Sequence, residues 1–181
     1  MSLPRLFLHP NVDLSQGGFT VHWSTVVGLL ALQALWVLRA RAHRGEHRPT
    51  PLQALSFSTG LLVMFLSLNG PIHDISDYYL FSGHMVQHLV LTIVTPPLLL
   101  LGTPGWMLRP ALRVKWVAAV ARVVTTPRAA FTIFNLVLAS WHLPPMYNAA
   151  MYYHEVHIVQ HLMFLVSAVL MWWPMLSPLP E

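Results

Sequence analysis

The sequence predicts an all-α integral membrane protein, a bundle of about five transmembrane helices. Of its 181 residues, 55% are hydrophobic and only 9% are charged, whereas an ordinary soluble domain carries about 25% charged residues. The apolar residues also gather in segments close to the roughly 20 residues that a spanning helix needs. We therefore expect residues 1–181 to form a single transmembrane helical domain with the lipid bilayer as its main partner.

Five segments approach the length of a membrane span. By residue number they are 19–38, 52–68, 79–101, 127–143 and 154–173. The fourth is the weakest by length, and Pro127 suits its first turn. The third contains Pro96 and Pro97, which a membrane helix tolerates but which are expected to kink it. Residues 106–122 combine Trp and Leu with cations, which fits a helix in the plane of the membrane interface and fits a solvated basic loop equally well.

The charges of the connecting loops predict the orientation. Residues 39–50 and 102–128 contain nine of the ten Lys and Arg residues. In residues 69–78, by contrast, the only charged residues are the acidic Asp74 and Asp77. By the positive-inside rule the basic loops are cytoplasmic, so the N-terminus lies outside and the C-terminus inside. The membrane accounts for the basic residues, and we expect no nucleic acid partner. The first residues lack the pattern of a removable signal peptide.

This orientation places nine of the eleven histidines outside, or in the outer halves of helices. Four of them belong to two copies of one motif, HMVQHL at 84–89 and HIVQHL at 157–162. The same offset of 73 residues pairs Pro71 with Pro144 and Tyr79 with Tyr152. Two spans separate equivalent points, so the pattern suggests a parallel repeat of a two-helix unit.

The histidine spacing predicts a metal site. Residues four apart in a helix differ by about 40° around the axis, so both histidines of each motif share a face and the two pairs can meet. Imidazole suits copper, zinc and iron, and nearby thioethers favour Cu(I). The predicted metal ligands are His84, His88, His157 and His161, with His73, His142 and His154 as further candidates. The residues expected to support them are Gln87, Gln160, Glu155, Asp74, Met85 and Met151.

Simpler explanations compete with this one. A single histidine inside a membrane is often only a polar contact between helices, and each methionine is more often packing than ligand. The chain has no cysteine, so thiolate sites are excluded. The stretch HEVHI at 154–158 departs from the zinc-protease pattern because Ile158 stands where that chemistry needs a second histidine. No nucleophile with a neighbouring base and no phosphate loop is present, so we do not expect an enzyme.

Three stretches resemble the CtaG-like family of multi-pass cytochrome c oxidase assembly factors, of the caa-type oxidase branch. They are SGHMVQHLVLTIVTPPLLLLGTP (82–104), SWHLPPMYN (140–148) and HIVQHLMFLVSAVLMWWP (157–174). The resemblance implies a protein of the bacterial plasma membrane that helps copper reach the oxidase, with oxidase subunits and a copper donor chaperone as partners. It points to His84, His88, His142, His157 and His161. Family members usually continue through further spans, so we expect this chain to be a shortened form.

Two other functions remain open at this point. Histidine pairs on facing helices also suit the axial ligands of a b-type haem. Alternatively, the histidines only tie helices together or relay protons, in a structural scaffold or a transporter without a metal site.

Overall fold

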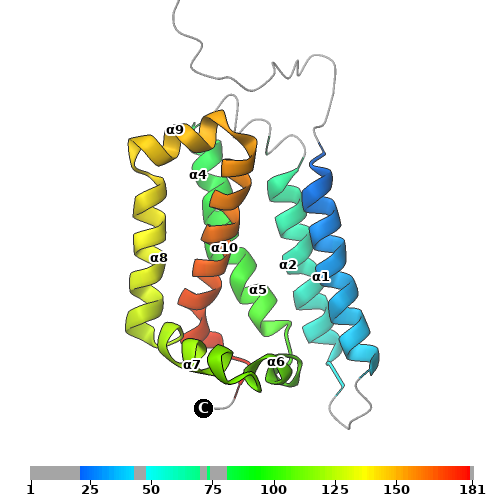
Figure 1. Cartoon of the computed structure of the whole chain (residues 1–181). Coiled ribbons are helices and arrows are strands. Elements are labelled where there is room, and N and C mark those ends of the chain that lie inside the picture. The colour runs from blue at the N-terminus through cyan, green and yellow to red at the C-terminus, as the bar shows by residue number, and fades with distance from the viewer. Residues whose placement is uncertain (1–20, 43–47, 70–72, 74–80, 180–181) are drawn as a thin grey trace, which may run out of the picture.

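The computed structural model describes residues 21–42, 48–69, 73 and 81–179, and every regular element in this part is a helix (Figure 1). The elements are α1 (Trp23–Ala42), α2 (Pro51–Leu68), α4 (Phe81–Leu89), a π-helical segment (Val90–Val94), α5 (Thr95–Leu101), α6 (Gly105–Leu112), α7 (Lys115–Val124), α8 (Pro127–Trp141), α9 (Pro144–Tyr152) and α10 (His154–Leu176). The predicted all-α fold is confirmed.

Four helical segments in the described part are long and apolar enough to cross a membrane. They are α1, α2, the continuous segment from α4 through α5, and α10. A fifth results if α7 and α8 are taken together, although an angle of 81° separates their axes. The structure therefore gives four or five candidate spans, in line with the prediction of about five, whereas the side of the membrane on which each end lies stays a prediction.

The predicted bounds of the spans need small corrections. The first described span begins at Trp23 and continues to Ala42 rather than ending at 38, because Arg and Ala alternate at its end and both favour helices. α2 begins at Pro51 behind a capping box, in which Thr50 and Gln53 each accept a bond from the other's backbone N–H. α10 continues to Leu176, three residues beyond the prediction.

The spans form a row in which α10 and the α4–α5 segment occupy the centre (Figure 1). α1 packs on α2, α2 packs on α5, α5 packs on α10, and α10 packs on α8. The main core lies between α1, α2 and the centre, around Leu29, Phe57, Leu61, Met64 and Leu91. Many outward side chains are apolar and exposed, as expected for surfaces that face lipid.

The kink predicted at Pro96 and Pro97 takes the form of the π-helical segment just before them. Neither proline has an N–H, so the carbonyl of Thr92 loses its backbone donor in both the α pattern (from 96) and the π pattern (from 97). The indole Nε1 of Trp172 donates to this carbonyl at 2.9 Å. The bond joins α10 to the centre of the α4–α5 segment and satisfies a group that lipid cannot solvate.

The single interfacial helix predicted at 106–122 is wrong in one respect, because two short helices cover this stretch. The backbone of Val114 is extended, with ψ of 113°, and separates α6 from α7. A β-branched residue favours this conformation. Since α7 makes an angle of 81° with α8, α7 runs close to the membrane plane when α8 crosses the bilayer.

The contact between α2 and the end of α5 yields a first prediction. A Cβ added to Gly102 would lie 2.6 Å from the Cα of Phe57. We expect Gly102→Ala to lower the free energy of unfolding by about 1–3 kcal/mol, because backbone atoms cannot move aside cheaply. Thermal unfolding in detergent measures the change. Gly28→Ala is the matched control, since nothing lies within 4 Å of its added Cβ; equal effects of both variants would contradict the explanation.

The bond across the π-helical segment yields a second prediction. Trp172→Phe keeps the apolar body of the side chain but leaves the Thr92 carbonyl without its donor. We expect this variant to lower the free energy of unfolding by about 1–3 kcal/mol, which is the cost of an unsatisfied buried polar group. Trp173→Phe is the control, because the structure gives the indole of Trp173 no hydrogen bond to the described residues. The two variants are compared by thermal unfolding, and similar stabilities would show that the bond is unimportant.

Candidate metal centre

The four motif histidines meet at the ends of two parallel helices. His84 and His88 are the fourth and eighth residues of α4, and His157 and His161 hold the same positions in α10. The ring centroids of His84 and His157 are 5.8 Å apart, and those of His88 and His161 are 5.4 Å apart. The first histidine of one motif thus lies beside the first histidine of the other, and the second beside the second. Only parallel helices allow this pairing. The predicted convergence is confirmed, and all four side chains are at most 8% exposed.

Within each motif the two rings point their Nε2 atoms at each other. The Nε2–Nε2 distance is 2.7 Å between His84 and His88, and 3.2 Å between His157 and His161. In each pair one Nε2 donates and the other accepts, so at least one imidazole of each pair is neutral and has the protonation that metal ligation requires.

The separations can be compared with those of a metal site. Two nitrogens bound to one tetrahedral metal at about 2.0 Å would be about 3.3 Å apart. The pair in α10 already has this spacing, and the pair in α4 must open by about half an ångström. Among the described residues, no three His, Asp or Glu side chains already surround a common metal position. The residues thus supply suitable donors in suitable pairs, and a third ligand requires a side chain to move.

Three more histidines extend the cluster in both directions. His73 lies against His157, with centroids 6.1 Å apart, and His22 lies 4.6 Å from His73. On the other side, the ring of His142 is 6.1 Å from that of His88. We call these residues the histidine cluster: His22, His73, His84, His88, His142, His157 and His161.

His142 has a defined orientation although its side chain is exposed. It caps the C-terminus of α8, and its Nδ1 donates to the carbonyl of Leu138 at 2.6 Å. A carbonyl only accepts, so Nδ1 carries the hydrogen and Nε2 of the neutral ring is left as the acceptor. The ring stacks on Phe164, which also contacts His88 edge-on.

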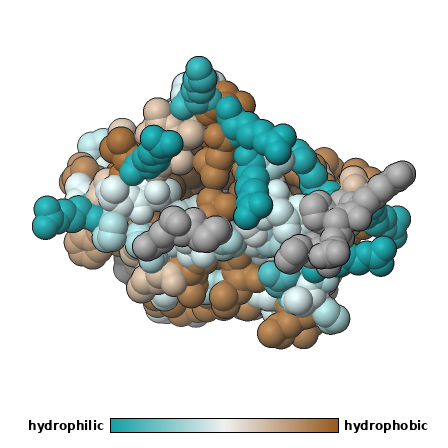
Figure 2. All heavy atoms as spheres, turned by 90° about the horizontal axis from the view of Figure 1, so that it is seen from below, coloured by the Kyte–Doolittle hydropathy of each residue, from teal (hydrophilic) through white to brown (hydrophobic). Residues whose placement is uncertain are grey.

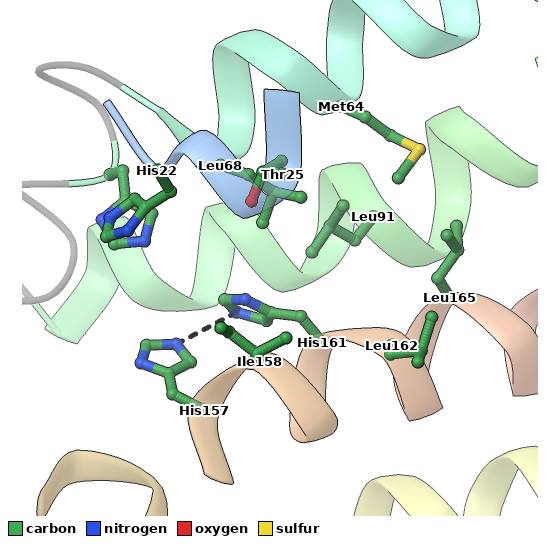
Figure 3. Close-up of a pocket in the computed structure, with 11 residues that line it drawn as sticks. His22, Thr25, Met64, Leu68, Leu91, His157, Ile158, His161, Leu162 and Leu165 are labelled. Carbon is green, nitrogen blue, oxygen red and sulfur yellow. Dashed lines mark hydrogen bonds between the residues drawn. The ribbon is translucent and has the colours of Figure 1, made fainter. Parts of the chain in front are cut away.

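A pocket of about 130 Å³ opens beside the cluster, between α1, α2, α10 and the π-helical segment (Figure 3). His22, His73, His157 and His161 line it together with the thioether-bearing Met64. Sequence reasoning had not singled out His22 or Met64 as site residues. His22 precedes the first span, and Met64 lies within an apolar run that resembles any other core segment, so only the packing of α1 and α2 identifies them.

The other predicted residues have different surroundings. The amide nitrogen of Gln87 donates to the backbone carbonyl of Ser67 at 2.8 Å, which ties α4 to α2; its predicted bond to an imidazole stays a prediction. Gln160 is buried, Met85 and Met151 are half-buried, and Glu155 is exposed in the first turn of α10. Asp74, Pro71 and Tyr79 lie outside the described residues, as does the side chain of His154.

The basic residues gather at the opposite end of the bundle. The histidine cluster lies where α4 and α10 begin, which we call the histidine end (Figure 1). The other end, which we call the basic end, is formed by the end of α1, the start of α2, α6, α7 and the start of α8. The described Lys and Arg residues are all in these segments: Arg39, Arg41, Arg48, Arg109, Arg113, Lys115, Arg122 and Arg128. The separation of charge and histidine expected from the loops is present in the fold.

Comparison with known proteins supplies the family. No curated protein and no solved structure matches the chain. Residues 31–181 match the family described as cytochrome c oxidase caa3 assembly factor (Caa3_CtaG). The match includes the second half of α1, all later spans and all of the histidine cluster except His22. A match over most of the chain agrees with the resemblance of its histidine motifs. The chain therefore belongs to the family of cytochrome c oxidase caa3 assembly factors.

Proposed function

We propose that this membrane protein binds copper through the histidine cluster and helps to deliver it to the oxidase. One observation supports the proposal above others: two pairs of buried imidazoles, from parallel helices, lie within 5.8 Å of each other. An ionisable group at membrane depth is costly and in general marks a function. Seven histidines in one group are more than the contacts between helices require.

The donor atoms favour copper as the cargo. Imidazole binds copper well, and a thioether shifts the preference toward Cu(I). Met64 brings a thioether to the wall of the pocket that His157 and His161 also line. In this proposal His84 with His88, and His157 with His161, hold the ion, while His73 and His142 are the neighbours through which it enters or leaves.

The excess of ligands suits transfer better than permanent storage. A metal ion in a protein commonly takes about four ligands, whereas the cluster contains seven imidazoles. Each ring lies within 6.1 Å of another ring of the cluster, so one donor can replace another in small steps. By the positive-inside rule, the histidine end faces outward from the bacterial plasma membrane. The oxidase subunits are the recipients there, and a copper donor chaperone is the source.

Copper binding gives the direct test. We expect His84→Ala/His88→Ala and His157→Ala/His161→Ala each to weaken Cu(I) binding by the purified protein by more than tenfold. Removal of a partner that only orients a ligand already costs about 10–100-fold, and here the ligands themselves are lost. A competition titration with a Cu(I) chelator measures the affinity and the stoichiometry.

The chain offers a matched control for this titration. His43 and His47 are also four residues apart, but they lie in the basic loop between α1 and α2. His43→Ala/His47→Ala should leave copper binding unchanged. If the three double variants bind copper as the wild type does, the histidine cluster is not the copper site.

Oxidase assembly tests the function separately from the affinity. In a strain that lacks the protein, we expect the wild type to restore assembled oxidase with its copper, and His84→Gln/His157→Gln to fail. Glutamine keeps a polar contact between helices but does not replace an imidazole as a ligand. Full assembly with the glutamine variant would favour a structural scaffold. A Soret band in the purified protein would instead favour the haem alternative.

A further inference from the structure

A second pocket lies at the basic end, far from the histidine cluster. Its volume is about 320 Å³, and its walls come from the end of α1 and from α6. Three arginines line it, Arg39, Arg109 and Arg113, with Trp106 and Pro110 as the apolar part of the wall. Seen from this end, hydrophilic side chains project around a strip of apolar surface (Figure 2). We call this pocket the arginine pocket.

Local structure explains why the three guanidinium groups share one pocket. Arg109 lies in the last turn of α6 and Arg113 caps its C-terminus, so they are four residues apart on one face. Arg39 lies in the last turn of α1. The two helices are connected nearby, because Trp36, one turn before Arg39, donates its indole N–H to the carbonyl of Gly102 at 3.0 Å.

The charge of the pocket calls for an anion. Glu155 is the sole acidic residue in the described part of the chain, and it lies at the histidine end. At the basic end, no described carboxylate balances the three arginines. The planar guanidinium group donates two parallel hydrogen bonds to a phosphate, which makes arginine the residue best suited to this ligand.

We propose that the arginine pocket binds a phosphate group, supplied by the headgroup of an anionic phospholipid. Basic pockets beside transmembrane helices are well suited to such headgroups. The neighbouring surface favours a lipid, since Leu35 and Leu38 on α1 are 54% and 64% exposed and offer an apolar path for acyl chains. Leu35 is one turn before Arg39 on the same face. This site is independent of the proposed copper function.

Native mass spectrometry of the full chain, purified in detergent and titrated with phosphatidylglycerol or phosphatidylcholine, tests the proposal. We expect one phosphatidylglycerol to bind at least tenfold more tightly than phosphatidylcholine. Arg39→Gln/Arg109→Gln/Arg113→Gln should remove this preference. Lys115→Gln/Arg122→Gln/Arg128→Gln removes the same charge outside the pocket and should reduce binding less than threefold. Equal losses in the two triple variants would overturn the proposal, as would equal binding of both lipids by the wild type.

Two further measurements test which part of the lipid is bound and whether the arginine variants still fold. Displacement of phosphatidylglycerol from the wild type by millimolar inorganic phosphate supports the phosphate group as the ligand; resistance to it supports a contribution of the acyl chains. Arg39→Lys/Arg109→Lys/Arg113→Lys keeps the charge but not the paired donors, and should show an intermediate loss. Unchanged thermal unfolding of the variants shows that binding was lost without loss of the fold, whichever result the copper experiments give.

Discussion

A backbone carbonyl in a bilayer has no water to accept a hydrogen bond from, and this constraint governs the centre of the molecule. Pro96 and Pro97 deprive Thr92 of its donor, and the indole of Trp172 replaces it. Side chains of a helix tilt toward its N-terminus, so Trp172 reaches back along α10 to this carbonyl. The bond fixes α10 against the α4–α5 segment. The meeting of the histidines depends on that alignment, because a shift by one turn would pair His88 with His157 instead of His161.

The histidine cluster illustrates how a repeated sequence makes one site. The two motifs are equal in length and begin at the same position of their helices, so parallel packing brings equivalent residues together without any special loop. Around this repeated part, His22, His73 and His142 come from unrelated segments and add donors on two sides. Burial makes the rings costly to leave without partners, and the hydrogen bond between the two Nε2 atoms of each motif reduces that cost.

Much of the fold and part of the site could be predicted from the sequence, for physical reasons that the individual residues show. The spans follow from composition and length, and the shared face of His84 and His88 follows from helical geometry alone. That the two histidine pairs can meet also follows from their spacing, but the packing that brings α4 and α10 together depends on contacts between segments 73 residues apart, which only the structure shows. For the same reason, the sequence alone does not identify Met64 and His22 as residues of the site. The break at Val114 was missed because hydrophobic and basic residues continue across it in a helical pattern.

The attachment of α1 has a consequence for the pocket beside the histidines. Leu29 is the only buried side chain among the 20 residues of α1. Hydrogen bonds hold much of the helix instead, from His22 N–H to the Asn69 side chain, from Ser58 to Gln33, and from Trp36 to Gly102. Helices with little buried surface open locally at the lowest free-energy cost. Because α1 forms one wall of the histidine pocket, a local opening of this helix would expose the pocket without separating the central helices.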